Sequence, residues 1–239
     1  MNRIILAGNH LKKTYGKNTV LKDVSLQVVQ GQIYGLIGKN GSGKTTLLRV
    51  LTGLIQNYSG TVTLNNEECR IVAVINEPAL FLNMTAFENL KGQAILLGLS
   101  DDDKIEETLK MVGLEDCGCR QVKNFSLGMT QRLKLAMVLL EKPDLLILDE
   151  PINGLDPDGI ADLRNLLRHL NEKYGITIII SSHILSELEH TATCFGILCN
   201  GEIVKEISEQ ELQQQGTNLE TLYMQCTRGE NYHVENSQK

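Results

Sequence analysis

The chain has 239 residues, of which 42% are hydrophobic and 22% charged, and its formal net charge is −6. This is the composition of an ordinary globular protein with a full core. The chain lacks the Lys/Arg runs that neutralise nucleic-acid phosphates, so DNA or RNA binding is disfavoured. No apolar run approaches the ~18 to 20 residues that cross a bilayer, and the N-terminal apolar stretch is too short for a signal peptide. We therefore expect a cytoplasmic protein with six reduced cysteines and no nucleic-acid partner.

The first thirty residues alternate between apolar and polar side chains, most clearly over residues 24–28. Such alternation predicts an antiparallel β-layer. An apolar run then predicts a buried strand over residues 32–37, and a helical pattern follows over residues 45–54. The connection between this strand and this helix is rich in glycine.

That connection fits the phosphate-loop pattern, which is Gly, four residues, Gly, Lys and Ser or Thr. Its glycines let successive backbone N–H groups converge on a phosphate, Lys44 adds a positive charge, and the Thr45 hydroxyl can ligate Mg²⁺. A chance match in a chain of this length has a probability of about 1%. The residues expected to hold the nucleotide here are Gly38, Lys39, Asn40, Gly41, Ser42, Gly43, Lys44, Thr45 and Thr46.

Between residues 85 and 141 the strand signal vanishes, and helices are expected over residues 85–97, 101–112 and 127–141. We interpret this region as a helical lobe inserted into an α/β core. The polar end, residues 228–239, is expected to be mobile. The folded domain should therefore span residues 1–227.

A second buried strand, residues 145–148, leads directly into Asp149 and Glu150. Both carboxylates then emerge at the carboxyl end of a strand, where α/β sheets bind ligands. One of them can hold the hydration shell of Mg²⁺ while the other positions and polarises an attacking water. The alternative is that both are solvated residues at a strand end.

A long helix is expected over residues 157–174, before a third buried strand at residues 176–180. Asp156 can cap its first amides, Pro157 suits the first helical position, and Gly175 can adopt the left-handed conformation that ends a helix. Capping alone would explain Asp156 without any catalytic role. Strands that alternate with helices indicate a largely parallel sheet.

Several motifs resemble those of ABC transporter ATPases. The segment Ser126-Leu127-Gly128-Met129-Thr130-Gln131-Arg132 resembles their signature motif, and Gly154-Leu155-Asp156 resembles their D-loop. Ser181-Ser182-His183 resembles the segment with their switch histidine, and Tyr15 matches the aromatic residue that stacks on adenine. The motifs follow the family's order and cover roughly residues 1 to 225.

The resemblance implies a P-loop NTPase core of the RecA-like type, with ATP and Mg²⁺ bound at the phosphate loop. Lys44, Glu150 and His183 would be catalytic, and Thr45 and Asp149 would hold the metal. It further implies a head-to-tail dimer, either a homodimer or a pair with a second ABC ATPase subunit. In that dimer the signature residues of one subunit would complete the γ-phosphate site of the other, and these are Ser126, Leu127, Gly128, Met129 and Gln131.

Membrane partners follow from the same resemblance. The chain would be a peripheral subunit on the inner face of the cell membrane, driving export of a peptide antibiotic or a similar amphiphile through separately encoded permease subunits. The apolar segment at residues 78–84 is expected to face that partner, and local core packing is the alternative. Competing functions are a soluble ABC ATPase outside transport and a module that closes on ATP with little turnover.

Some assignments have plainer readings. His183 could be a satisfied residue at a strand end, and Tyr15 could pack in the core. Cys117 and Cys119 suggest a metal site, but no second Cys/His pair accompanies them, so free thiols are favoured.

The sequence also departs from the family. Asn76 stands where a glutamine usually touches Mg²⁺, and because its side chain is one methylene shorter, a water can bridge the gap. Leu127 stands where the signature usually has a small residue, and Ile152 stands where Thr is common before the D-loop. With the Asn-Glu-Pro segment that Asn76 begins, these departures resemble the ABC-2-type exporters of bacitracin resistance and lantibiotic self-protection.

Overall fold

The computed structural model describes residues 3–66, 68–75, 78–99 and 101–228. Asn76 lies outside the described residues, as does all but the first residue of the predicted mobile end. Among the described residues, no helix is long and apolar enough to cross a membrane.

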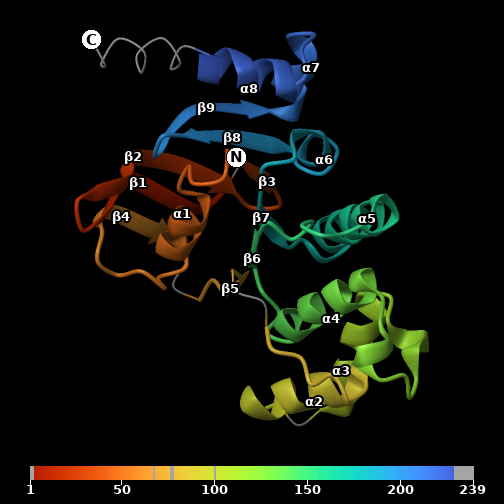
Figure 1. Cartoon of the computed structure of the whole chain (residues 1–239). Coiled ribbons are helices and arrows are strands. Elements are labelled where there is room, and N and C mark those ends of the chain that lie inside the picture. The colour runs from red at the N-terminus through yellow and green to blue at the C-terminus, as the bar shows by residue number, and fades with distance from the viewer. Residues whose placement is uncertain (1–2, 67, 76–77, 100, 229–239) are drawn as a thin grey trace.

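Two sheets form the centre of the molecule (Figure 1). The smaller is antiparallel, in the order β2-β1-β4, and consists of β1 (Ile4–Tyr15), β2 (Asn18–Val29) and β4 (Ser59–Leu64). The larger has the order β5-β6-β7-β3-β8-β9 and is parallel except for the last pair. Its strands are β5 (Ile71–Val74), β6 (Leu145–Asp149), β7 (Thr177–Ser182), β3 (Ile33–Ile37), β8 (Cys194–Cys199) and β9 (Glu202–Ser208).

The helices fall into three groups. The inserted lobe contains α2 (Ala86–Leu96), α3 (Asp102–Met111) and α4 (Leu127–Leu139), with the short 3₁₀ turns η1 (Glu115–Cys117) and η2 (Val122–Asn124). The core carries α1 (Lys44–Leu51), α5 (Pro157–Tyr174) and α6 (Leu185–Glu189). The C-terminal end adds α7 (Glu209–Gln214) and α8 (Leu219–Arg228). Figure 1 shows the lobe at one end of the molecule and α7 and α8 at the other, with the sheets between them.

Alternating side chains of the large sheet enter two apolar cores. On β6, Leu146 and Leu148 pack toward the lobe, α5 and the C-terminal helices, whereas Leu145 and Ile147 pack toward α1 and the antiparallel sheet. Strand residues that point to both faces and are buried on both read as a continuous apolar run. This explains why β6 was visible in the sequence.

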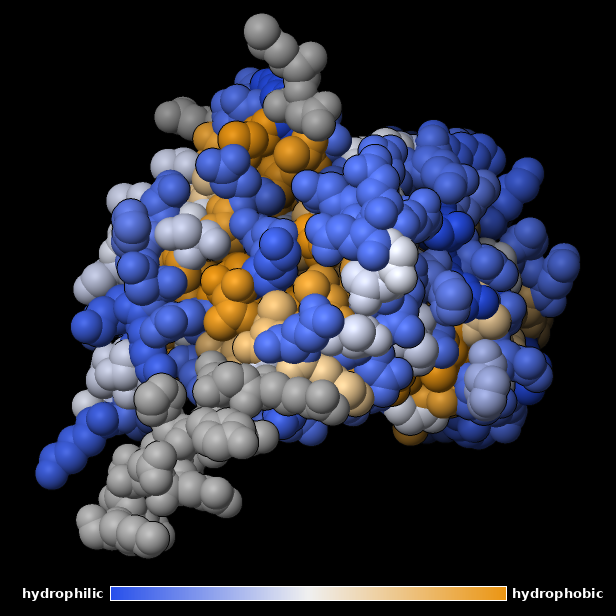
Figure 2. Space-filling model, turned by 90° about the horizontal axis from the view of Figure 1, so that it is seen from above, coloured by the Kyte–Doolittle hydropathy of each residue, from blue (hydrophilic) through white to orange (hydrophobic). Residues whose placement is uncertain are grey.

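The end of the molecule that carries α7 and α8 has a mainly hydrophilic surface with apolar side chains gathered toward one side (Figure 2). Val204 of β9 and Met224 of α8 are exposed hydrophobic residues of these elements.

The α/β fold with an antiparallel layer and a helical lobe is confirmed. The helix predicted over residues 157–174 is α5: the Asp156 carboxylate accepts the Gly159 N–H at 2.9 Å, and Gly175 has φ 69°. The helix predicted to reach residue 54 was wrong at its end. It stops at Leu51, because Thr52 is its C-cap and Gly53 turns the chain with φ 73°.

Candidate nucleotide site

The phosphate loop leaves β3 at Gly38 and enters α1 at Lys44. A Cβ at Gly38 would lie 2.4 Å from the Ser42 hydroxyl and 2.5 Å from the Leu198 carbonyl, so the loop's tight path requires glycine there. Gly43, with φ 109°, caps α1 and leaves the helix's first amides without a side-chain cap. The amides that a capping residue would otherwise satisfy are therefore available to an anion.

Lys44 is anchored inside the loop. Its side chain is only 5% exposed; the ammonium donates to the Gly38 carbonyl at 2.6 Å and lies 3.0 Å from Glu150 Oε1. A charge that is nearly buried is tolerated when it is paired and hydrogen-bonded. These contacts place the positive charge of Lys44 between the first residue of the phosphate loop and Glu150.

Asp149 is held by two hydroxyls. Thr45 Oγ1 donates to Asp149 Oδ2 and Ser181 Oγ donates to Asp149 Oδ1, both at 2.6 Å. Asp149 and Ser181 are register partners on the neighbouring strands β6 and β7. The carboxylate therefore faces the first turn of α1 in a fixed orientation.

Glu150 follows at the end of β6 with φ 52°, a conformation that non-glycine residues seldom adopt and that often marks a functional constraint. Its N–H donates to Ser181 Oγ at 2.9 Å, and its Oε2 lies 2.8 Å from Nδ1 of His183. The carboxylate is thus set between the ammonium of Lys44 and the ring of His183.

The residues present fit a nucleotide and a hard cation. The Ser42 hydroxyl is buried and has no hydrogen-bond partner among the described residues, so it is free to donate to a phosphate. Thr45 and Asp149 bring two oxygen donors together, and Mg²⁺ is commonly held by one or two such protein oxygens plus substrate phosphates. No cluster of three or more His, Cys, Asp or Glu side chains suited to a metal occurs in the described part of the chain, Cys117 and Cys119 included.

The signature segment lies on a different surface, at the start of α4. The Ser126 hydroxyl accepts the Met129 N–H at 3.2 Å and so caps the helix, while Leu127 is 53% exposed. Gly128 faces Gly159 of α5, since a Cβ at Gly128 would lie 4.0 Å from the Gly159 Cα. A cavity of about 570 Å³ lies beside these helix starts and is lined by residues of both, including Asp156.

Comparison with known proteins decides the family. A family model described as ABC transporter matches residues 21–153, more than half of the chain. This chain belongs to the ABC transporter family. It is an ATP-binding protein and an ATPase of that family.

Two bacterial relatives are similar over most of their length. Lantibiotic transport ATP-binding protein SrtF from Streptococcus pyogenes is 45% identical over 203 residues, which cover 82% of this chain and 88% of the relative. Bacitracin transport ATP-binding protein BcrA from Bacillus licheniformis is 42% identical over 219 residues, covering 88% and 72%. The crystal structure of an ATP-binding cassette of an ABC transporter in its ADP conformation matches with a TM-score of 0.80 at 27% identity, covering 88% of this chain and 94% of that one.

Within this ABC ATPase, the structure brings the loop together with Asp149, Glu150 and His183, as the sequence predicted. Tyr15 lies at the end of β1 and is 47% exposed, so it does not pack in the core. Gln131 departs from the other signature residues. It lines a second cavity, of about 210 Å³, with Asp149 and Glu150 of the same chain.

Sequence reasoning on this ABC ATPase missed three residues with defined contacts. Ser181 was predicted only as part of the segment with the switch histidine, although its hydroxyl orients Asp149. The signature motif includes Arg132 but predicts no role for it, and no pattern in the sequence singles out Lys13. Arg132 lies 3.0 Å from the Asp162 carboxylate and donates to the Val112 carbonyl at 2.9 Å, which joins α4 to α5 and to the end of α3. The available signal for Arg132 was a charged residue directly before the apolar run of its helix, most of which is buried.

Proposed function

We propose that this chain is the ATP-hydrolysing subunit of an exporter and drives a peptide antibiotic of the lantibiotic or bacitracin kind through separately encoded membrane subunits. The names of its relatives support this cargo: one is a lantibiotic transport protein and another a bacitracin transport protein. The working location is the cytoplasmic face of the membrane.

The contact of Glu150 with both Lys44 and His183 carries the proposal for hydrolysis. ATP binds with its phosphates on the loop amides, and Lys44 turns from Glu150 to the phosphate oxygens. Glu150, released from its ion pair, then accepts a proton from the attacking water. His183 holds the carboxylate and contacts the γ-phosphate.

Thr45 and Asp149 would hold Mg²⁺, which neutralises charge on the β- and γ-phosphates when it is bound. Ser181 fixes the other oxygen of Asp149, so the carboxylate keeps its orientation as the nucleotide enters. Tyr15 stacks on the adenine. Asn76, outside the described residues, contributes through a bridging water.

A second subunit completes the site. Ser126 and Gly128 lie at an exposed helix N-terminus, whose amides and positive dipole end favour an anion. In a head-to-tail dimer they bind the γ-phosphate held by the partner, and Asp156 lies at the same junction. The dimer pairs two copies of this chain or this chain with a second ABC ATPase.

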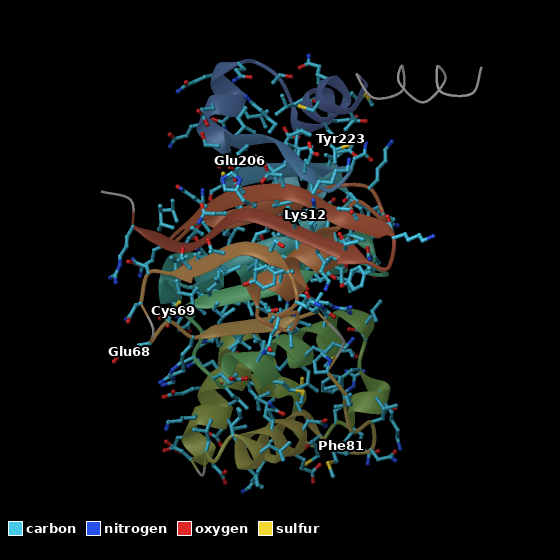
Figure 3. The ribbon with its side chains drawn as sticks, turned by 90° about the vertical axis from the view of Figure 1, so that its left-hand side faces the viewer. Lys12, Glu68, Cys69, Phe81, Glu206 and Tyr223 are labelled. Carbon is cyan, nitrogen blue, oxygen red and sulfur yellow. The ribbon has the colours of Figure 1, made fainter. Side chains whose placement is uncertain are left out.

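The membrane subunits dock on the lobe. Phe81 is 61% and Leu82 56% exposed, although both are large and apolar. Figure 3 shows Phe81 at the lobe end of the molecule, away from Glu206 of β9. Exposed apolar side chains at one place on a chain support a protein interface there.

The test of hydrolysis is Glu150→Gln, which keeps the size of the side chain and removes the base. Phosphate release should fall by at least about 100-fold, while ATP binding persists and an ATP-dependent dimer accumulates in gel filtration. Glu172→Gln, at an exposed position of α5, is the matched control and should change neither. Unchanged hydrolysis in the Glu150 variant would remove Glu150 from the mechanism.

The test of export uses cells that express the chain with its membrane subunits. Phe81→Glu should abolish tolerance of the antibiotic while the purified chain hydrolyses ATP at the normal rate. Leu96→Glu, at an exposed leucine elsewhere on the lobe, should leave tolerance intact. Loss of folding in the Phe81 variant would instead favour local packing.

A further inference from the structure

Lys13 is a nearly buried lysine in the antiparallel sheet. The residue is 8% exposed, whereas the adjacent Lys12, labelled on β1 in Figure 3, is exposed. Lysine is almost never buried without a partner. Here the ammonium donates to the Asn57 carbonyl at 2.5 Å and lies 4.8 Å from the centre of the Tyr15 ring. Neither partner is a carboxylate, so within the described residues the charge is stabilised by a backbone carbonyl and by the ring.

The surroundings connect Lys13 to the phosphate loop. Lys13 is the cross-strand partner of Leu21, whose side chain would lie 3.0 Å from a Cβ at Gly43 of the loop. Asn57 belongs to the segment that leaves α1. The hairpin that carries Tyr15 is closed by a 3.1 Å hydrogen bond between the hydroxyls of Thr14 and Thr19. Tyr15 is therefore fixed at its backbone by the hairpin and at its ring by Lys13.

We propose that Lys13 is a positioning residue for the adenine base. The inference rests on the proposed stacking of adenine on Tyr15. Because Lys13 is buried, the ring face that it covers is turned toward the protein, and the exposed part of the ring remains open to a base. A cation on one face withdraws electron density from the ring, which favours stacking of an electron-rich purine on the other. A ring that is already held also loses less freedom when the base arrives.

A purely structural role makes a different prediction. If Lys13 only joins β1 to the segment after α1, its loss disturbs the phosphate loop through Leu21 and Gly43. Binding of a ligand without a base would then weaken as much as binding of a nucleotide. The two roles therefore separate when ligands with and without adenosine are compared.

The experiment measures the dissociation constants of ADP and of pyrophosphate by calorimetry, with Mg²⁺ present, on the full chain. Lys13→Met should weaken ADP about fivefold and change pyrophosphate by less than about twofold. Lys12→Met removes the same charge from the exposed neighbour and should change neither. Lys13→Gln keeps a donor for Asn57 without the charge and should reproduce the loss for ADP, which covers the case in which the methionine variant does not fold.

A double-mutant cycle with Tyr15→Ala completes the test. The single Tyr15 variant should weaken ADP but not pyrophosphate, and Lys13→Met should add nothing in its background. Equal losses for the two ligands, or an additive effect of the two substitutions, would overturn the role of Lys13. If Tyr15→Ala leaves ADP affinity unchanged, the stacking of adenine on Tyr15 is itself refuted, which is a separate failure of the proposed site.

Discussion

The phosphate-loop side and the signature side of this molecule differ in how firmly the chain's own contacts hold their functional side chains. On the first, Lys44, Asp149 and Glu150 all have partners within the chain at 2.6 to 3.0 Å. On the second, the hydrogen bond of the Ser126 hydroxyl within the described residues is to the amide of its own helix, and Ser126 and Leu127 are exposed. The first side holds its charged side chains in place and leaves the Ser42 hydroxyl and the first amides of α1 open to a phosphate, whereas the second offers only a helix N-terminus.

The difference follows from where each side lies in the fold. Asp149 and Glu150 end a central strand, so neighbouring strands and α1 surround them. Ser126 and Gly128 begin a helix at the edge of the lobe, where one side of the helix start faces solvent. A nucleotide on the loop can therefore bind to a single chain, but hydrolysis should require a second chain to bring its signature segment.

The largest effect should come from Gly128→Asp, which puts a carboxylate where the partner's γ-phosphate would dock. A Cβ there meets no atom closer than 4.0 Å, so the chain should fold. Hydrolysis should fall by about 100-fold or more because the new charge opposes the anion. ADP affinity of the isolated chain should stay unchanged, since the loop lies elsewhere. Phosphate release and calorimetry measure the two quantities.

The control is Gly92→Asp, which adds the same charge at another helical glycine of the lobe with open space around it. It should leave hydrolysis unchanged. Mixing the Gly128 variant with a Lys44→Met variant should restore activity, because one composite site then receives an intact loop and an intact signature. If the mixture stays inactive while both variants dimerise, the two sides do not complement each other.

A smaller effect is expected at Arg132, which joins the signature helix to its surroundings. Arg132→Met loses the contacts to Asp162 and to the Val112 carbonyl, and the free energy of unfolding should fall by about 2 kcal/mol. Hydrolysis should fall several-fold, because α4 and α5 are no longer tied one turn beyond Gly128 and Gly159. Urea denaturation and phosphate release measure both.

Asp162→Asn separates the two contacts of Arg132. Asp162 is 63% exposed, so its ion pair should contribute less than about 1 kcal/mol. If the asparagine variant is as unstable as Arg132→Met, the carbonyl contact to Val112 carries no stability and the account of Arg132 fails.

The sequence predicted those parts of the fold whose signals are local. The ends of α5 were visible because Asp156, Pro157 and Gly175 each act on adjacent residues. β4 was missed because five of its six residues are exposed and its pairing joins residues far apart, such as Leu6 with Leu64. β9 and the C-terminal helices were missed for a similar reason: β9 is mostly exposed and pairs only with β8.

For the candidate site, residue types were predictable but partnerships were not. The loop and the two carboxylates stand in recognisable patterns beside apolar runs. That Ser181 holds Asp149 depends on the register of β6 and β7, which no local pattern specifies. That Gln131 faces the carboxylates of its own chain depends on the direction from which α4 approaches the sheet.

The smallest effect on nucleotide binding should come from the contact between β3 and β9. Tyr34 of β3 is fully buried, and its hydroxyl donates to Glu206 Oε1 at 2.6 Å. Glu206 as a residue is exposed, but its carboxyl group is partly buried beside Tyr34, and this desolvation raises its pKa above the ordinary value of 4.5. The hydrogen bond from Tyr34 lowers the pKa in part. Between the unfolded and folded pKa values, the folded state binds more protons than the unfolded state. The stability contributed by protonated Glu206 is therefore present below pH 4.5 and lost as the pH rises through the folded pKa.

In Glu206→Gln the side chain has no titratable group, so the free energy of unfolding of this variant should rise relative to that of the wild type as the pH increases through that window. Tyr34→Phe removes the interaction that lowers the pKa, and the window should extend to higher pH. Urea denaturation from pH 4 to about pH 8 measures both. ADP affinity should not follow these changes, because Lys44 and Thr45 make their contacts with Gly38, Glu150 and Asp149, and none of these contacts involves Tyr34 or Glu206. If ADP affinity follows the pH dependence of stability, the phosphate-loop side depends on β9, and the positions of its side chains are a property of the whole sheet.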